Sequence, residues 1–160
     1  MNPQPALSAA TFQPLILEEM AIVDLFIDVL KREQQALVEG HADLLTSLAA
    51  EKTDCYNRLD RLGRKRQLML TAAGMAAVPA SLTYWLESQA LSLQETWQAF
   101  LLKAGEARDL NRQNGELINS HMQYNRQALT VLLEISNRAS VYGPDGQPRP
   151  SGGGRILGKC

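Results

Sequence analysis

The chain has 160 residues, of which 45% are hydrophobic, 21% charged and 6% aromatic, and its formal net charge is −1. One domain is the default at this length. The near-zero charge provides no field to recruit nucleic acid or acidic lipid, and no apolar run reaches the roughly 18 residues that a stable membrane insertion requires. No Lys or Arg precedes Lys31, so the basic start of a secretory signal is missing and we expect a cytoplasmic location.

Cysteines and histidines are too few to predict a site. Cys55 and Cys160 are the only cysteines, and they lie too far apart in the chain to indicate a disulfide framework. His41 and His121 are the only histidines, and no pair of these residues has the spacing of metal ligands. No nucleophile or paired carboxylates stand out, so we expect no metal, no cofactor and no catalytic residue.

Two helices are predicted in the first half of the chain. Apolar residues recur at spacings of three, four and seven over residues 14–39, after Pro14, which suits a first helical turn. Gly40 can end this helix in a left-handed conformation. The same period returns over residues 41–72. Because the connection is so short, the two helices should form an antiparallel hairpin.

A third, longer helix is predicted over residues 81–138. The uncharged segment 71–80 should be a connector, and Ser81 suits the N-cap of the helix that follows. No proline interrupts this helix, and its two glycines, at about 1 kcal/mol each, weaken it without ending it. The chain shows no strand alternation. We therefore predict an all-α fold, an elongated antiparallel three-helix bundle or coiled coil in a domain of residues 1–138, followed by a tail of residues 139–160.

The third helix is too long for the hairpin to cover. At about 1.5 Å per residue, the first two helices measure roughly 39 and 48 Å and the third roughly 85 Å. The covered part should run out between Arg112 and Leu117, and the rest should project with an apolar stripe that usually marks an interaction surface. The apolar residues of this part are Leu117, Ile118, Met122, Tyr124, Leu129, Val131, Leu132, Leu133 and Ile135.

Several other residues have structural interpretations. Three asparagines follow the helical seam of the third helix: Asn111, Asn114 and Asn125. We interpret them as register controls, because a polar group in a seam penalises slipped pairings. The basic run Arg58–Arg66 spreads around the helix with Asp54 and Asp60 close by, which indicates a solvated face. Trp85 and Trp97 are predicted to anchor the third helix against the hairpin.

The end of the chain has a different composition. Glycine and proline make up nine of the twenty-one residues from Ser140 to Cys160. Such a segment cannot offset its ordering entropy by burial, so we expect it to be disordered. Within it, the turn-forming motif VYGPDG carries one large aromatic residue, Tyr142, and tyrosine is a frequent binding anchor.

The chain resembles the FlgN family of flagellar export chaperones over nearly its full length. The resemblance is sharpest at DLNRQNG (109–115), NRQAL (125–129) and YGPDGQ (142–147). It implies a small cytoplasmic three-helix protein without enzymatic activity. Such a protein binds the terminal helices of flagellar hook–filament junction proteins, prevents their premature assembly and delivers them to the flagellar type III export gate.

The resemblance also assigns residues to these two contacts. The client-binding residues are Leu117, Ile118, Met122, Leu129, Leu132, Leu133 and Ile135. The residues for the cytoplasmic domain of the export gate are Tyr142, Gly143, Asp145 and Gly146. The proline- and glycine-rich segment 148–154 departs from the pattern of the family.

Two other classes of function stay open. The chain could be a structural coiled-coil subunit without a client, whose third helix pairs with itself in a homodimer. A mass measurement in solution would distinguish this homodimer from the chaperone. An RNA-binding regulator would use the basic run Arg58–Arg66, and its mark would be binding that weakens steeply with salt.

Overall fold

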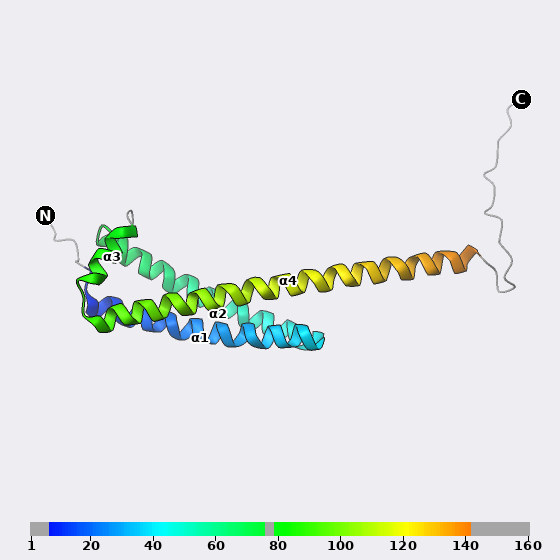
Figure 1. Ribbon diagram of the computed structural model, residues 1–160, viewed down its shortest axis with the longest axis horizontal. Helices are drawn as coiled ribbons and strands as arrows, with labels where there is room; N and C mark the ends of the chain where they lie inside the picture. Colours follow the sequence, from blue (N-terminus) through cyan, green and yellow to red (C-terminus); the bar gives the residue numbers. More distant parts are fainter. Residues whose placement is uncertain (1–6, 76–78, 142–160) are drawn as a thin grey trace, which may run out of the picture. The chain divides into compact units, whose positions relative to one another are not determined.

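The computed structural model describes residues 7–75 and 79–141, and all regular secondary structure in these ranges is helical (Figure 1). The helices are α1 (Ala9–Glu39), α2 (Ala42–Ala72), α3 (Pro79–Glu87) and α4 (Leu91–Val141). This confirms the all-α prediction for the described residues. The chain divides into two compact units, Met1–Leu117 and Ile118–Cys160. The bundle described next belongs to the first unit.

Helices α1 and α2 form the expected antiparallel hairpin (Figure 1). Gly40 ends α1 with φ 76°, and its backbone N–H donates to the carbonyl of Ala36. Ion pairs then join the two helices in antiparallel order, with Lys52 2.9 Å from Glu33 near the turn and Arg66 2.8 Å from Glu19 far from it. The left-handed turn that glycine permits therefore sets the pairing of the hairpin.

Within the first unit, α4 runs parallel to α1 and therefore antiparallel to α2. Near the start of α1, the Gln13 side chain donates to Thr96 at 3.3 Å. Near the end of α1, the Asn114 side chain donates to the carbonyl of Leu30 at 2.8 Å. The up-down-up order of a three-helix bundle follows from these contacts.

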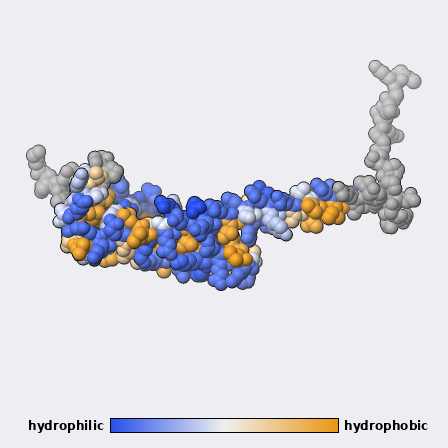
Figure 2. Space-filling model, in the orientation of Figure 1, coloured by the Kyte–Doolittle hydropathy of each residue, from blue (hydrophilic) through white to orange (hydrophobic). Residues whose placement is uncertain are grey.

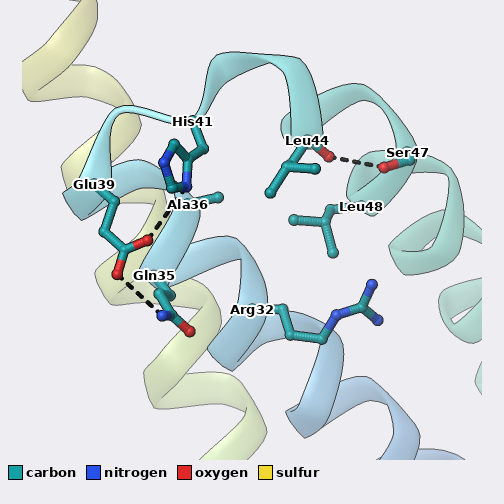
Figure 3. A pocket seen from close by; sticks show the side chains of 8 residues that line it. All are labelled: Arg32, Gln35, Ala36, Glu39, His41, Leu44, Ser47 and Leu48. Atoms are coloured by element: carbon teal, nitrogen blue, oxygen red, sulfur yellow. Dashed lines mark hydrogen bonds and ion pairs between the residues drawn. The ribbon is translucent and has the colours of Figure 1, made fainter.

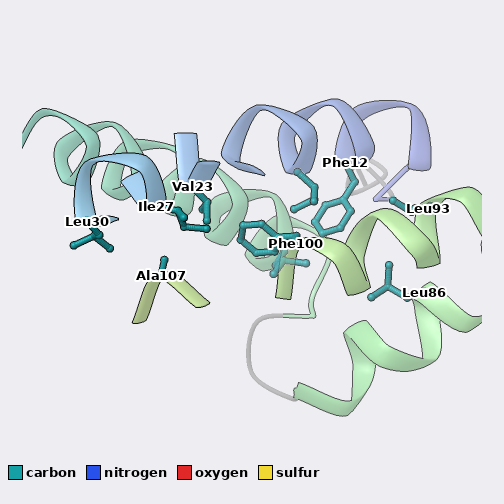
Figure 4. Packing of buried hydrophobic residues seen from close by; sticks show 10 residues of the cluster. Phe12, Val23, Ile27, Leu30, Leu86, Leu93, Phe100 and Ala107 are labelled. Atoms are coloured by element: carbon teal, nitrogen blue, oxygen red, sulfur yellow. The ribbon is translucent and has the colours of Figure 1, made fainter. Parts of the chain in front are cut away.

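The apolar core has two parts, one on each side of α1. The first joins α1 to the other three helices (Figure 4), through Phe12, Ile16, Val23, Ile27, Leu30, Leu70, Leu86, Leu93, Phe100 and Ala107. The second joins α1 to α2 alone, through Ile22, Val29, Ala36, Leu48 and Cys55. Helix α1 is thus the central helix of the bundle.

The two tryptophans anchor the bundle as predicted. The ring of Trp85 lies edge-on to Phe12 with 5.4 Å between centroids, and the ring of Trp97 lies 5.9 Å from the same phenylalanine. Phe12 itself is completely buried. Aromatic contacts of this kind add to the burial energy of the rings.

Two buried carboxylates of α1 are paired by α2. Glu19 accepts from the Nε of Arg66, whose guanidinium also lies over the rings of Trp97 and Phe100, at 5.9 and 5.6 Å. Glu33 accepts from Lys52 at 2.9 Å. The interpretation of the whole basic run as a solvated face was therefore wrong for Arg66. Its charge offsets a buried carboxylate that lies far from it in the sequence.

Several predicted helix boundaries were wrong. Helix α1 begins at Ala9, so Pro14 lies inside it and not in the first turn. The carbonyl of Ser8 accepts from the backbone N–H of Phe12 at 2.9 Å, and the burial of Phe12 supports this early start. Helix α3 begins at Pro79 rather than after an N-cap at Ser81, because proline suits the first helical position.

The predicted third helix is divided in two. A break after Glu87 separates α3 from α4, and the side chain of Gln94 donates to the carbonyl of Gln89 at 2.9 Å beside it. Leu86 and Leu93, on either side of the break, both enter the core around Phe12. The glycines at 105 and 115 both lie inside α4, so they do not end the helix, as predicted.

Candidate functional site

The candidate site is the α4 segment 118–137, in which every described side chain from Asn119 to Asn137 is exposed. Its exposed large hydrophobic residues are Met122, Tyr124, Leu129, Val131, Leu132, Leu133 and Ile135. Leu132 is 63% and Ile135 58% exposed. Figure 2 shows hydrophobic residues gathered along α4 near the end of its described part. Exposed apolar residues this close together are typical of an interaction surface.

The segment is strongly amphipathic. At about 3.6 residues per turn, its large apolar residues share one side of the helix. The opposite side carries Gln123, Gln127, Thr130 and Glu134. Arg126 and Glu134 are the only charges from 118 to 137. A helix with this division normally buries its apolar side against another element.

In the first unit, α4 buries one residue in every seven. Leu93, Phe100, Ala107 and Asn114 follow this spacing, and all four are buried. The side chain of Asn114 is completely buried and donates to the Leu30 carbonyl and to Glu33 Oε2, both at 2.8 Å. This polar contact agrees with a role in setting the register.

The predicted client-binding residues fall into two groups. Leu117 and Ile118 are half-buried, whereas Met122, Leu129, Leu132, Leu133 and Ile135 are exposed. Tyr124 and Val131 are also exposed, and their positions in the helical period place them on the apolar side with Ile135. The predicted gate-binding residues Tyr142, Gly143, Asp145 and Gly146 lie outside the described residues.

The surroundings shift the pKa values of several titratable groups in α1 and α2. Burial raises the pKa of the Glu19 carboxyl, and its hydrogen bond with Arg66 opposes that rise. The pKa of Glu51 is lowered, chiefly by the hydrogen bond from Arg32. Burial also raises the pKa of the Cys55 thiol, which disfavours the nucleophilic thiolate. Within 7–75 and 79–141, no three His, Cys, Asp or Glu side chains are grouped to hold a metal ion.

A hollow of about 230 Å³ lies beside the α1–α2 turn (Figure 3). Its titratable lining side chains already have partners within the protein. Glu39 lies 3.2 Å from His41, and Arg32 pairs with Glu51 at 2.7 Å. These four side chains are 44–54% exposed, and each is already paired within the protein. We therefore place the candidate site on α4.

In the part of the chain that the structure describes, no helix combines the length and apolar character needed to cross a membrane. The fold and the exposed apolar side of α4 define an all-helical protein whose candidate site is a surface suited to the apolar face of another protein. Comparison with known proteins then identifies the family. The sequence model described as FlgN protein matches residues 1–150, so the chain belongs to the FlgN family.

Curated relatives cover most of the chain. It is 32% identical over 146 residues to the flagella synthesis protein FlgN of Salmonella typhimurium strain LT2, which spans 88% of this chain and 94% of the relative. It is 29% identical over 144 residues to the protein of the same name from Yersinia enterocolitica, spanning 89% and 90%. For the protein from Escherichia coli K12, the identity is 25% over 135 residues, spanning 82% and 86%. No solved structure gives a significant match.

Proposed function

We propose that this chain is an export chaperone that binds flagellar hook–filament junction proteins, prevents their premature assembly and delivers them to the flagellar type III export gate. Membership of the FlgN family gives the chain a role in flagellum synthesis, the role for which its curated relatives are named. The client and the gate are inferences beyond that name. We also propose that the chain acts by binding, without catalysis, and that it works in the cytoplasm.

The exposed apolar side of α4 is the observation that carries the proposal. Met122, Leu129 and Leu133 are each 46% or more exposed, with few charges around them. Covering one such side chain with a partner contributes about 1.5–3 kcal/mol. A terminal helix that later builds a filament must present an apolar face of its own, so each surface would protect the other from unwanted association.

Binding to a purified junction protein tests the client site. The variant carries serine at Leu129, Leu132 and Ile135. The matched control carries alanine at Gln123, Gln127 and Thr130, on the opposite side of the same segment. We expect the first variant to lose client binding and the control to retain it, with both proteins melting like the wild type because all six positions are exposed. Unchanged client affinity in the serine variant would remove the basis of the proposal.

The solution mass of the free protein tests the alternative of a structural homodimer. A monomer that pairs with a junction protein fits the chaperone. A stable dimer that the serine variant dissociates, and that takes up no junction protein, would favour the structural subunit.

The gate contact is proposed on the sequence of the tail. Tyr142→Ala should weaken binding to the cytoplasmic domain of the gate while leaving client affinity unchanged, because a single aromatic anchor in a Gly- and Pro-rich peptide suits a separate receptor. The measurement is a titration of the gate domain with both proteins, with and without client. Equal gate affinities would contradict the assignment, and a loss of client binding would mean that the two contacts are not separable.

A further inference from the structure

The width of the apolar side of α4 indicates how many helices cover it. At about 100° per residue, the large apolar residues of 118–137 span an arc of about 200°, from Val131 on one edge to Leu133 on the other. The remaining arc of about 160° holds the glutamines and both charges of the segment. A surface helix that packs on a core typically has an apolar stripe of at least about 100°. The exposed arc is about twice as wide.

Helix α1 of the same chain provides a comparison on the same scale. Its buried residues, from Phe12 to Leu37, span an arc of about 180° on the same scale. Two helices cover that arc. The edge with Val29 packs against α2 alone, and the edge with Ile16 and Ile27 packs in the core that includes α4.

The middle of the buried arc of α1 is partly polar. Glu19 and Glu33 lie between its two apolar edges, among buried apolar residues. Glu33 is reached from both neighbouring helices, and Glu19 is reached from α2. Arg66 and Lys52 of α2 bind these carboxylates, and Asn114 of α4 donates to Glu33. Polar groups mixed with apolar ones between two apolar edges are thus the pattern of a helix packed between two others in this protein.

The exposed segment of α4 repeats this pattern. One edge carries Tyr124, Val131 and Ile135, and the other carries Met122, Leu129 and Leu133. Between the two edges, the helical period places His121, Asn125 and Ser136, together with Leu132. All of these side chains are exposed.

We propose that the 118–137 segment of α4 takes the central place in a three-helix bundle with two helices of one client protein, as α1 does between its two neighbours. This inference rests on the proposed chaperone function. The client helices present apolar faces to the two edges and polar groups to His121 and Asn125, which would otherwise be buried without partners. A second copy of this chain, pairing through its own α4, supplies only one helix and leaves one edge uncovered.

Site-specific photocrosslinking in the complex with a full-length junction protein tests the inference. The crosslinking residue replaces Val131 on one edge, Leu133 on the other, or Gln127 on the polar side as the control. We expect Val131 and Leu133 to crosslink to two different helices of the client, and Gln127 to give no crosslink. Crosslinks from both edges to one client helix, from one edge only, or between two copies of this chain would overturn the inference.

Paired substitutions give an independent readout by affinity. Val131→Ser with Ile135→Ser removes one edge, and Leu129→Ser with Leu133→Ser removes the other. Each pair should weaken binding to the full-length client by at least about 100-fold. With a client that keeps only one terminal helix, only one of the two pairs should still weaken binding. A full-length client sensitive to one pair alone would refute the two-helix arrangement but keep the chaperone function, whereas a wild-type chain that binds no client refutes both.

Discussion

Asn114 connects α4 to α1 at the scale of a single residue. Its side chain is completely buried and donates to a backbone carbonyl and to the Glu33 carboxylate. We expect Asn114→Ala to lower the free energy of unfolding by about 1–3 kcal/mol, because both hydrogen bonds are lost inside the protein. Urea denaturation measures the change. Asn111→Ala is the control, since Asn111 is exposed, and an equal effect of the two substitutions would contradict the structural role.

Glu19 should give the protein a pH dependence of known sign. Its pKa is raised in the folded state, chiefly by burial. A raised carboxyl pKa contributes stability that is fully present below the ordinary value of 4.5 and is lost as the pH rises through the folded pKa. The free energy of unfolding of the wild type, minus that of Glu19→Gln, should therefore fall as the pH rises above 4.5.

Glu51 is the control for this measurement, because the hydrogen bond from Arg32 lowers its pKa. The same difference, taken with Glu51→Gln, should rise as the pH increases through the lowered pKa toward 4.5 and then level off. Denaturation series between acidic and neutral pH give both curves. A difference for Glu19 that rises with pH would mean that Arg66, and not burial, dominates at this carboxyl.

At the scale of the elements, glycine has different effects inside α4 and at the end of α1. A Cβ at Gly105 would meet no atom within 4 Å, and the residue lies inside α4. Gly105→Ala should therefore raise the free energy of unfolding by about 0.5–1 kcal/mol. Gly40 has a φ of 76°, so Gly40→Ala should lower it by about 1–2 kcal/mol, although space is also available there. Thermal melts with matched urea curves measure both, and two changes of the same sign would contradict the prediction.

For the whole molecule, we expect the first unit to be stable by itself. The unit ends at Leu117, and every described side chain from Asn119 to Asn137 is exposed. A fragment of residues 1–117 should unfold with a free energy within about 0.5 kcal/mol of the full chain, because the described side chains from Asn119 to Asn137 that it lacks are exposed. Urea denaturation of both proteins, followed by circular dichroism, measures this. A clear loss of stability in the fragment would mean that the apolar side of α4 packs within the free protein.

Much of the fold was predictable because its signals are local. Apolar spacing predicted helices over most of α1 and α2, and the lone glycine at position 40 predicted the turn between them. Composition also predicted that α4 carries an apolar side with few charges. No glycine or proline lies at the break between α3 and α4, so the sequence predicted one continuous helix. The break is supported by Leu86 and Leu93, which both reach the core around Phe12.

The sequence by itself determined the helical class, the hairpin and the amphipathic character of the long helix, because each depends on residues within a few turns of one another. Only the tertiary structure decided which polar groups are buried. Arg66 belongs to a basic run, but in the fold it pairs with Glu19, 47 positions away, and lies over two aromatic rings. The faces of α1 and of the 118–137 segment of α4 both carry polar residues between two apolar edges, but they differ in burial for the same reason. Helix α1 has two neighbours that cover its face, whereas the described face of α4 beyond Ile118 is exposed, and periodicity alone cannot distinguish a covered face from an uncovered one.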